Sequence, residues 1–221
     1  MSRVAIVGAL LLAALSGCSG LLHSDAQPEQ VYYLRTKTAD PPSEAARSAV
    51  EASLRVGHPF AAPGLDSPRI VLMQSDRRMN FYAASRWPAS VPDVVESLAV
   101  ETLRASGAWR SVEDSTSPFP SDYLLQIAVR RFDADYSSGG AAPEVHVVLD
   151  CIVGRREGRD VIASFMAEGS SAAAANRLTD VIAAFEEAAN TALGSLSEHA
   201  LEAVRSRARQ KSDRPVPSKT R

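Results

Sequence analysis

Alternating hydrophobic and polar positions dominate the second half of the chain. The two-residue period of a half-buried strand is clearest in the run that contains Tyr123, Leu125, Ile127 and Val129. A second alternating run surrounds Cys151, and a third extends from Val161 to Glu168, with turn-forming residues between the runs. Because strands that follow one another through short turns usually pair side by side, this pattern predicts an antiparallel meander.

Two shorter strands and a helix are expected before the meander. The β-rich runs Arg69–Gln74 and Met79–Ala83 are separated by a polar turn, which predicts a hairpin. Ser90 then stands three residues before Asp93, as in a capping box, and apolar residues recur at helical spacing until Gly107. The sequence therefore predicts an amphipathic helix between Ser90 and Gly107.

The segments around these elements are less regular. Val31–Arg35 and Trp109–Val112 are short strand candidates, and the Ser/Pro-rich run Asp114–Ser121 is expected to be a loop. Five prolines from Pro41 to Pro68 predict a long loop, which is expected to contain one short helix at Ser43–Leu54.

The last regular element is expected to be a long helix from about Arg177 to Val204. Its apolar stripe consists of Leu178, Ile182, Phe185, Ala189, Leu193 and Leu196. The apolar stripe of such a helix must be buried against another element, and one face of the sheet is the simplest candidate. The predicted fold is α+β, a two-layer single domain in which a mostly antiparallel β-sheet is covered by two amphipathic helices.

The N-terminus has the features of a cleaved lipoprotein leader. Arg3 precedes an apolar run from Val4 to Leu15, which is shorter than the roughly 20 residues of a membrane-spanning helix. The run ends in Leu15-Ser16-Gly17-Cys18, which resembles the lipobox that the lipoprotein signal peptidase recognises. This resemblance implies that Cys18 becomes the acylated N-terminus. An ordinary secretory leader followed by a chance cysteine is the alternative.

The expected domain organisation follows from this leader. Residues 1–17 are the signal peptide, 18–30 a flexible tether, 31–204 the folded domain and 205–221 a basic tail. The tail has seven Lys or Arg residues against one acid and is predicted to be disordered. Contact with anionic lipid headgroups or peptidoglycan is its alternative role. By the usual sorting rule, Ser19 in place of Asp indicates the outer membrane rather than the inner membrane.

Composition and motifs argue against an enzyme, a metal protein or a nucleic-acid-binding protein. The net charge of −2 and the hydrophobic fraction of 45% are ordinary for a globular domain. The four histidines lack the spacing of zinc ligands, and the sequence has no nucleophile elbow, Walker loop or dinucleotide fingerprint. No catalytic residue, metal or cofactor is predicted.

Three residues with reactive side chains have structural explanations. Cys151 lies on the apolar face of its strand, which indicates a buried structural thiol rather than a catalytic one. Asp133 and Asp135 lie two apart at a strand end and are interpreted as solvated turn residues rather than as an acid–base pair. A periplasmic enzyme is therefore the weakest of the functional hypotheses.

Aromatic residues are the candidates for a partner interface, because aromatic side chains are enriched where interfaces concentrate their energy. The candidates are Tyr32, Tyr33, Tyr82, Trp87 and Trp109. For Trp87 and Trp109, core packing beneath the helix between them is the favoured alternative. A small basic patch near the hairpin, interpreted as a solvated face or as a contact for lipid phosphates, consists of Arg77, Arg78 and Arg86.

A series of short landmarks resembles a known family. The landmarks are Tyr32-Tyr33-Leu34, Pro68-Arg69-Ile70-Val71, Phe81-Tyr82 to Arg86-Trp87, Ser106-Gly107-Ala108-Trp109, Asp122-Tyr123-Leu124 and Arg131-Phe132-Asp133-Ala134-Asp135. In this order, from about Val31 to Leu201 and behind a lipobox, they resemble the ABC-type transport auxiliary lipoproteins, the PqiC-like family. The resemblance is loosest between Thr36 and Gly64, and the basic tail has no counterpart in it.

The resemblance implies a function that the residues alone do not. Such lipoproteins work beside MCE-domain proteins, with an ABC ATPase and permease or with PqiA/PqiB-type membrane partners, and move phospholipid between the two membranes. The chain is then expected to be a non-catalytic, lipid-anchored accessory subunit of a PqiABC- or Mla-like system. It would dock the lipid conduit at the outer membrane, support membrane integrity and assemble as a homo-oligomeric ring. The alternative is an outer-membrane assembly or plug lipoprotein without an MCE partner.

Overall fold

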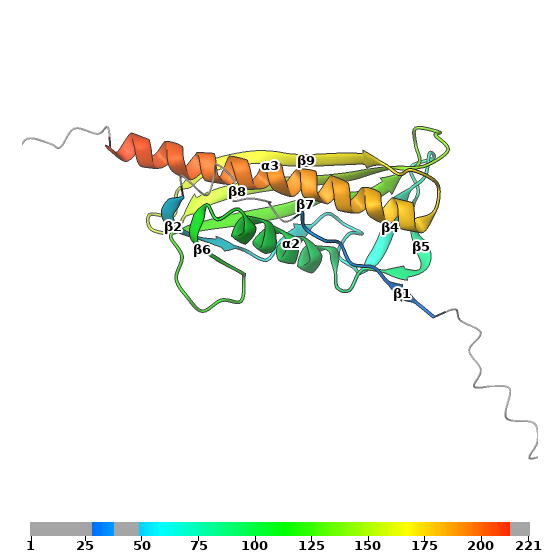
Figure 1. Ribbon diagram of the computed structural model, residues 1–221, viewed down its shortest axis with the longest axis horizontal. Helices are drawn as coiled ribbons and strands as arrows, with labels where there is room; N and C mark the ends of the chain where they lie inside the picture. Colours follow the sequence, from blue (N-terminus) through cyan, green and yellow to red (C-terminus); the bar gives the residue numbers. More distant parts are fainter. Residues whose placement is uncertain (1–27, 38–48, 213–221) are drawn as a thin grey trace, which may run out of the picture.

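The computed structural model describes residues 28–37 and 49–212 of the 221-residue chain. In these residues, two helices and a mostly antiparallel, mixed sheet of nine strands form one α+β domain (Figure 1). The strands are β1 Gln30–Val31, β2 Val50–Val56, β3 Phe60–Ala61, β4 Arg69–Met73, β5 Met79–Arg86, β6 Trp109–Glu113, β7 Tyr123–Asp135, β8 Glu144–Arg155 and β9 Val161–Ala172. The helices are α2 Val91–Ala105 and α3 Leu178–Ser212. The predicted fold class is confirmed.

The three long strands β7, β8 and β9 form the predicted antiparallel meander. β8 pairs with β7 from Tyr123↔Arg155 to Asp135↔Glu144, and with β9 from Glu144↔Ala172 to Gly154↔Val161. Cys151 lies in the middle of β8 and is fully buried, as its place in the alternating pattern predicted.

The other edge of β7 is shared by three short strands that run parallel to it. β2 pairs with the beginning of β7, β3 with its middle and β4 with its end. β4 also forms the predicted antiparallel hairpin with β5, while β6 extends the sheet beyond β2 and β1 extends it beyond β5. β7 is therefore the strand around which the sheet is assembled.

Helix α2 begins as the sequence predicts. The backbone amide of Asp93 donates a hydrogen bond to the Ser90 side chain, and Pro92 stands in the first turn, where a missing amide costs nothing. One face of α2 buries Val91, Val95 and Leu103 against the sheet. The helix ends before Gly107, which has a φ of 63° that favours glycine.

Helix α3 packs across β9 and β8 through small side chains. Ala188 and Ala192 are fully buried, and the backbone of α3 approaches β9 at Gly169 so closely that a Cβ there would lie 2.0 Å from the Ala188 carbonyl oxygen. Glycine at 169 therefore allows the helix to lie directly on the strand.

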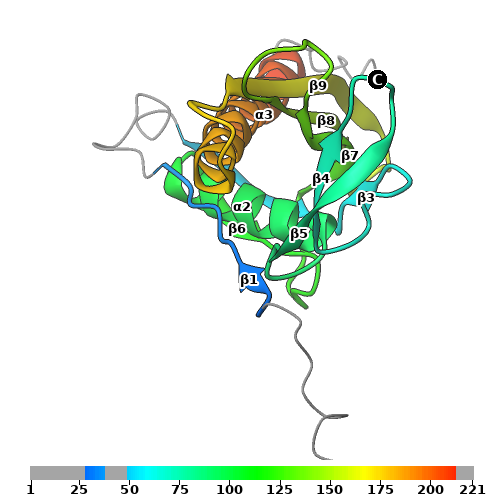
Figure 2. The same cartoon turned by 90° about the vertical axis from the view of Figure 1, so that its right-hand side faces the viewer.

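An aromatic cluster fills the space between the helices and the curved sheet. The Trp87 ring lies 5.7 Å from Phe132 on β7 and 5.2 Å from Phe185 on α3, in edge-to-face geometry. Figure 2, viewed along the long axis, shows the sheet curling around the two helices without closing on itself. The three rings thus join the hairpin, the meander and α3 in one core.

Two predicted elements are wrong in part, and one is shorter than predicted. Residues 50–54 were predicted to be helical but belong to β2, because Leu54 and Val56 are fully buried between β6 and β7 and non-local pairing outweighs local preference. The predicted strand at Val31–Arg35 is limited to β1.

Helix α3 also continues to Ser212, so residues 205–212 are helical and do not belong to a disordered tail. Its extension is stabilised by side-chain pairs such as Ser206 with Glu202. Residues 43–48 of the predicted short helix, Cys18 and most of the tether, and tail residues 213–221 lie outside the described residues.

The two ends of the elongated domain carry different elements. Figure 1 shows that the described chain begins, at β1, at the end that also carries the β4–β5, β7–β8 and β9–α3 turns. The C-terminal end of α3 lies at the opposite end, beyond the ends of the strands. The beginning of the described chain and the C-terminal end of α3 therefore lie at opposite ends of the domain.

Candidate docking surfaces

Trp87, one of the predicted interface residues, is a core residue. Its side chain is completely buried in the aromatic cluster with Phe132 and Phe185. Trp109 is 8% exposed and packs in the core near α2. Core packing, the favoured alternative for both residues, is therefore what the fold shows, and the prediction of Trp87 as an interface residue is corrected because the folded chain itself covers it.

Tyr82 is half-buried and joins three segments at the end of the domain where β1 lies. Its hydroxyl lies 2.9 Å from the Tyr136 hydroxyl, and the Tyr136 hydroxyl donates a hydrogen bond of 2.8 Å to Asn176 before α3. Burial, reinforced by the Tyr136 hydroxyl, raises the pKa of Tyr82 well above its usual range. Tyr82 therefore links the β4–β5 hairpin to the meander, and only part of its ring is exposed to a partner.

Tyr32 and Tyr33 belong to an extended segment that crosses α3. Tyr33 is 70% exposed, whereas Tyr32 packs partly against the core and donates a hydrogen bond to Gln30. The same segment is fixed to α3, because the Lys37 amide donates to Asn190 at 2.8 Å and the Arg35 amide donates to Glu186 at 3.0 Å. Tyr33 is therefore the most exposed of the candidates Tyr32, Tyr33, Tyr82 and Trp87.

Asp133 and Asp135 are not solvated turn residues. Asp133 is 5% exposed and accepts two hydrogen bonds from the Arg131 guanidinium, at 3.1 and 2.7 Å, and Asp135 accepts another from it at 2.9 Å. These bonds, led by the one to Asp133, raise the pKa of Arg131. The β7–β8 pairing shifts register between Val129 and Arg131, and this bulge turns Phe132 rather than Asp133 toward the core. Both carboxylates are thus held in an ion-pair network, and the earlier interpretation is corrected.

Cys151 has the properties of a structural thiol. It is fully buried in β8, and burial, together with the negative charge of Asp150, raises the pKa of its thiol to about 12. A thiolate is therefore disfavoured at neutral pH. Within residues 28–37 and 49–212, no group of three or more His, Cys, Asp or Glu side chains is placed to hold a metal ion. In the same residues, no helix combines the length and hydropathy that a membrane crossing requires.

A hollow with an apolar floor runs along one face of α2, and we call it the α2 groove. It has a volume of about 710 Å³, which is within the range of ordinary ligand sites. Val100 and Ala105 contribute apolar surface, and one wall is the loop that follows β6. The residues that line it are His58, Asp93, Glu96, Ser97, Val100, Glu101, Arg104, Ala105, Asp114, Ser115 and Thr116.

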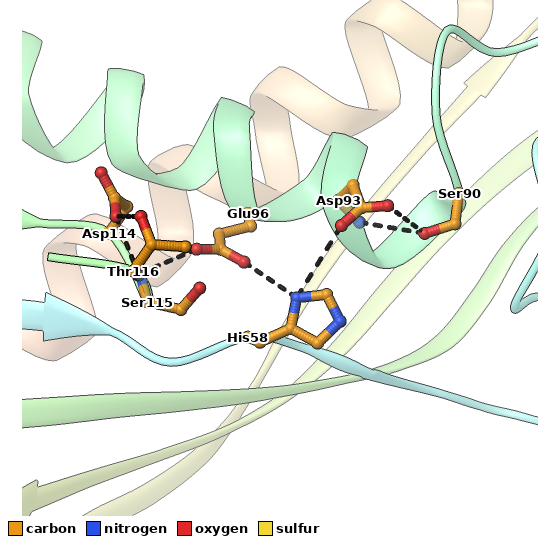
Figure 3. Close-up of polar contacts among 7 residues, drawn as sticks. All are labelled: His58, Ser90, Asp93, Glu96, Asp114, Ser115 and Thr116. Atoms are coloured by element: carbon orange, nitrogen blue, oxygen red, sulfur yellow. Dashed lines mark hydrogen bonds and ion pairs between the residues drawn. The ribbon is translucent and has the colours of Figure 1, made fainter.

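Glu96 holds the walls of the α2 groove together. Its carboxylate accepts a hydrogen bond of 2.8 Å from the Ser115 amide and contacts the His58 ring nitrogen Nδ1 at 3.0 Å (Figure 3). His58 also lies 3.9 Å from Asp93, whose other oxygen accepts a 2.6 Å bond from Ser90. Three segments distant in sequence therefore meet on α2.

The α2 groove is acidic. Four carboxylates line it against the single guanidinium of Arg104, which donates to the Val112 carbonyl oxygen at 2.9 Å. Hydrogen bonds from Thr116 hold the pKa of Asp114 below its usual range, so its charge persists in mildly acidic conditions. Glu101 is exposed, and its side chain has no hydrogen bond or ion pair to another described residue. The groove therefore presents negative charge around an apolar floor, which suits a basic segment of a protein partner.

Sequence reasoning missed this groove. Asp93 and Glu101 are visible on the polar face of the predicted helix, but nothing local shows that His58 and the loop after β6 lie beside them. A stretch of acids at helical spacing next to a long polar loop is the signal that the sequence offers.

Comparisons with known proteins agree with the observed fold. The family model for the ABC-type transport auxiliary lipoprotein component matches residues 32–198. Protein XCC0632 from Xanthomonas campestris, assigned to DUF330, has a TM-score of 0.73 and 26% identity, with coverage of 81% of this chain and 99% of that chain. An uncharacterized protein of solved structure has a TM-score of 0.59 and 13% identity, covering 80% and 99% of the two chains, and so shares the fold. The comparison with curated proteins found no match.

Proposed function

Because the chain belongs to the ABC-type transport auxiliary lipoprotein family, we propose that it is the lipid-anchored accessory subunit of an MCE/ABC-type phospholipid transport system. In this role it docks the periplasmic end of the lipid conduit at the outer membrane and supports membrane integrity. The proposal takes Cys18 as the acylated residue and Ser19 as the sorting signal for the outer membrane. The observation that carries it is the family match over residues 32–198, nearly the whole folded domain, in a chain whose N-terminal part contains a lipobox-like sequence ending at Cys18.

The surface of the domain supports a docking role rather than a chemical one. At the α2 groove, Glu96 bonds the Ser115 amide and His58 and so holds the walls of the groove together, which is a structural rather than a chemical role. The groove and the exposed Tyr33 are surfaces that a protein partner can use. Because β1 lies at one end and the α3 terminus at the other, an anchored domain can present its far end to the periplasm.

Whole-cell crosslinking followed by pull-down of the acylated protein tests this function. We expect recovery of an MCE-domain protein together with its membrane or ABC transporter subunits. Recovery of an outer-membrane barrel or its assembly machinery without an MCE protein would replace the proposal with an assembly or plug role.

The membrane anchor has its own test. Cys18→Ser is expected to prevent acylation and to release the protein into the soluble periplasmic fraction, because the thioether-linked chains are removed. Cys151→Ser is the matched control, since Cys151 is buried in β8 and far from the leader in sequence. Unchanged membrane retention of the Cys18 variant would refute the anchor.

A further inference from the structure

Two features of the domain are complementary and lie at different places on the chain: the acidic α2 groove and the basic end of α3. We propose that the C-terminal end of α3 from Arg205 onward, with the residues that follow it, docks in the α2 groove of a second copy of this chain. The proposal does not depend on which transporter the protein serves.

The end of α3 projects beyond the body of the domain. A helix of 35 residues is about 52 Å long, whereas the 12-residue strand β9 on which it lies spans about 40 Å. Up to Gln210, where the side chains of α3 are described, Val204 is the last buried residue, with 2% exposure, and Arg207, Ala208, Arg209 and Gln210 are exposed. Figure 1 shows the helix end continuing past the strands. It is therefore accessible to another molecule.

The charges of the two features are opposite. Residues 205–221 contain seven Lys or Arg and one Asp, and the α2 groove has four carboxylates against one guanidinium. The Arg209 side chain is 71% exposed, and its pairing with Glu202, at 4.0 Å, is long. Opposite patches of this kind steer association and fix the register of a contact.

The geometry favours a second copy over the chain's own groove. Arg207 contacts Asp160 in the β8–β9 turn at 3.2 Å, and Val204 packs beside it, so the last turns of α3 are held along the helix axis. That axis continues past the ends of the strands (Figure 1), whereas the groove lies along α2, at Asp93, Ser97 and Glu101. A contact between two different surfaces is heterologous, and its repetition forms a ring or a filament.

Disulfide trapping between variants that each carry one added surface cysteine tests the contact, since the native thiol of Cys151 is buried. Ser97→Cys lies in the groove and Gln210→Cys lies on the exposed end of α3. Each substitution is made separately in the full-length acylated protein. The two preparations are then mixed in detergent under mild oxidation. We expect a crosslinked dimer in the mixture and little in either preparation alone, with several-fold less in high salt because screening shortens the range of the charges. Ser164→Cys on the exposed face of β9 replaces Ser97→Cys in the matched control.

Charge reversal identifies the residues of the contact. Glu101→Arg and Arg209→Glu are each expected to reduce the trapped dimer about tenfold, and the mixture of the two reversed partners is expected to restore much of it. Both side chains are exposed, so folding is expected to be unchanged.

Three results would overturn the proposal. The first is a yield no higher than that of the Ser164→Cys control. The second is a disulfide formed within one chain when both cysteines are placed in the same molecule, which would mean that the tail folds back on its own groove. The third is capture of a different protein by the groove in cells while the purified protein stays monomeric.

Discussion

Helix α3 consists of two regions that differ in what they contact. From Val181 to Val204 it lies on the sheet, buries Phe185, Ala188 and Ala192, and approaches β9 at Gly169. From Arg205 to Ser212 it continues as a helix, Arg207 pairs with Asp160 in the β8–β9 turn, and residues 207–210 are exposed. The first region packs in the core of the domain, whereas the side chains of residues 207–210 in the second region are exposed. A helix can thus be continuous in geometry while its sequence changes from packing residues to charged ones.

The largest effect is expected where the first region enters the aromatic core. Phe185→Ala removes the ring that contacts both Trp87 and Phe132 and should lower the free energy of unfolding by about 3–5 kcal/mol. Denaturant unfolding monitored by circular dichroism measures the change. The exposed control Thr191→Ala is expected to stay within about 0.5 kcal/mol of the wild type. An effect of that small size for Phe185→Ala would contradict the assignment of this region to the core.

A second prediction concerns the close contact between α3 and β9. Gly169→Ala places a Cβ against the backbone of Ala188, which cannot rotate away as a side chain can, so a loss of about 1–3 kcal/mol is expected. Gly194→Ala in α3 is the control, because a Cβ there meets no atom within 4 Å. Thermal unfolding of both variants provides the comparison, and an equal or smaller loss at 169 would show that the helix does not lie so close.

The boundary between the two regions can be located by a smaller change. Val204→Ala should cost about 1.5 kcal/mol, because it removes two buried methyl-sized groups, while Ser206→Ala, just beyond the boundary, should cost little. A large effect at Ser206 in chemical unfolding would mean that the packed region extends further than Val204.

The smallest expected effect concerns the pH dependence of the second region. The hydrogen bond from Arg155, with the nearby charge of Arg207, holds the pKa of Asp160 below its usual range. A lowered pKa means that the ionised carboxylate stabilises the folded contact above the unfolded pKa of about 3.9, and that this contribution is lost as the pH falls through the folded pKa. The Arg207 side-chain Nε–Hε signal in NMR spectra should shift over that pH range. In Asp160→Asn the shift should disappear, and a shift that persists would assign the titration to another group.

The sequence predicts the elements whose pattern is local. The meander follows from the two-residue period of β7 and β8, and α2 follows from Ser90, the helical spacing and Gly107. Burial of Cys151 follows from the same alternation. In each case the signal lies within one element, so no knowledge of its neighbours is needed.

The remaining features depend on contacts between distant segments. β2 is a strand because β6 and β7 pair with it, although its local composition favours a helix. The bulge after Val129 changes which side of β7 faces the core, and this is why Asp133 lies buried beneath Arg131 rather than in a turn. The α2 groove needs His58, α2 and the loop after β6 to meet. None of these contacts can be predicted from the hydrophobic periodicity of a single element.

Hydrogen exchange of backbone amides in the full-length acylated protein is the measurement that tests the division of α3 and its docking role most directly. In dilute protein, amides between Val181 and Val204 should exchange slowly and those of residues 205–212 quickly. At high protein concentration and low salt, protection should rise together in residues 205–212 and in the groove wall at residues 114–116. Uniformly slow exchange along α3, or no concentration-dependent change at either surface, would contradict the account.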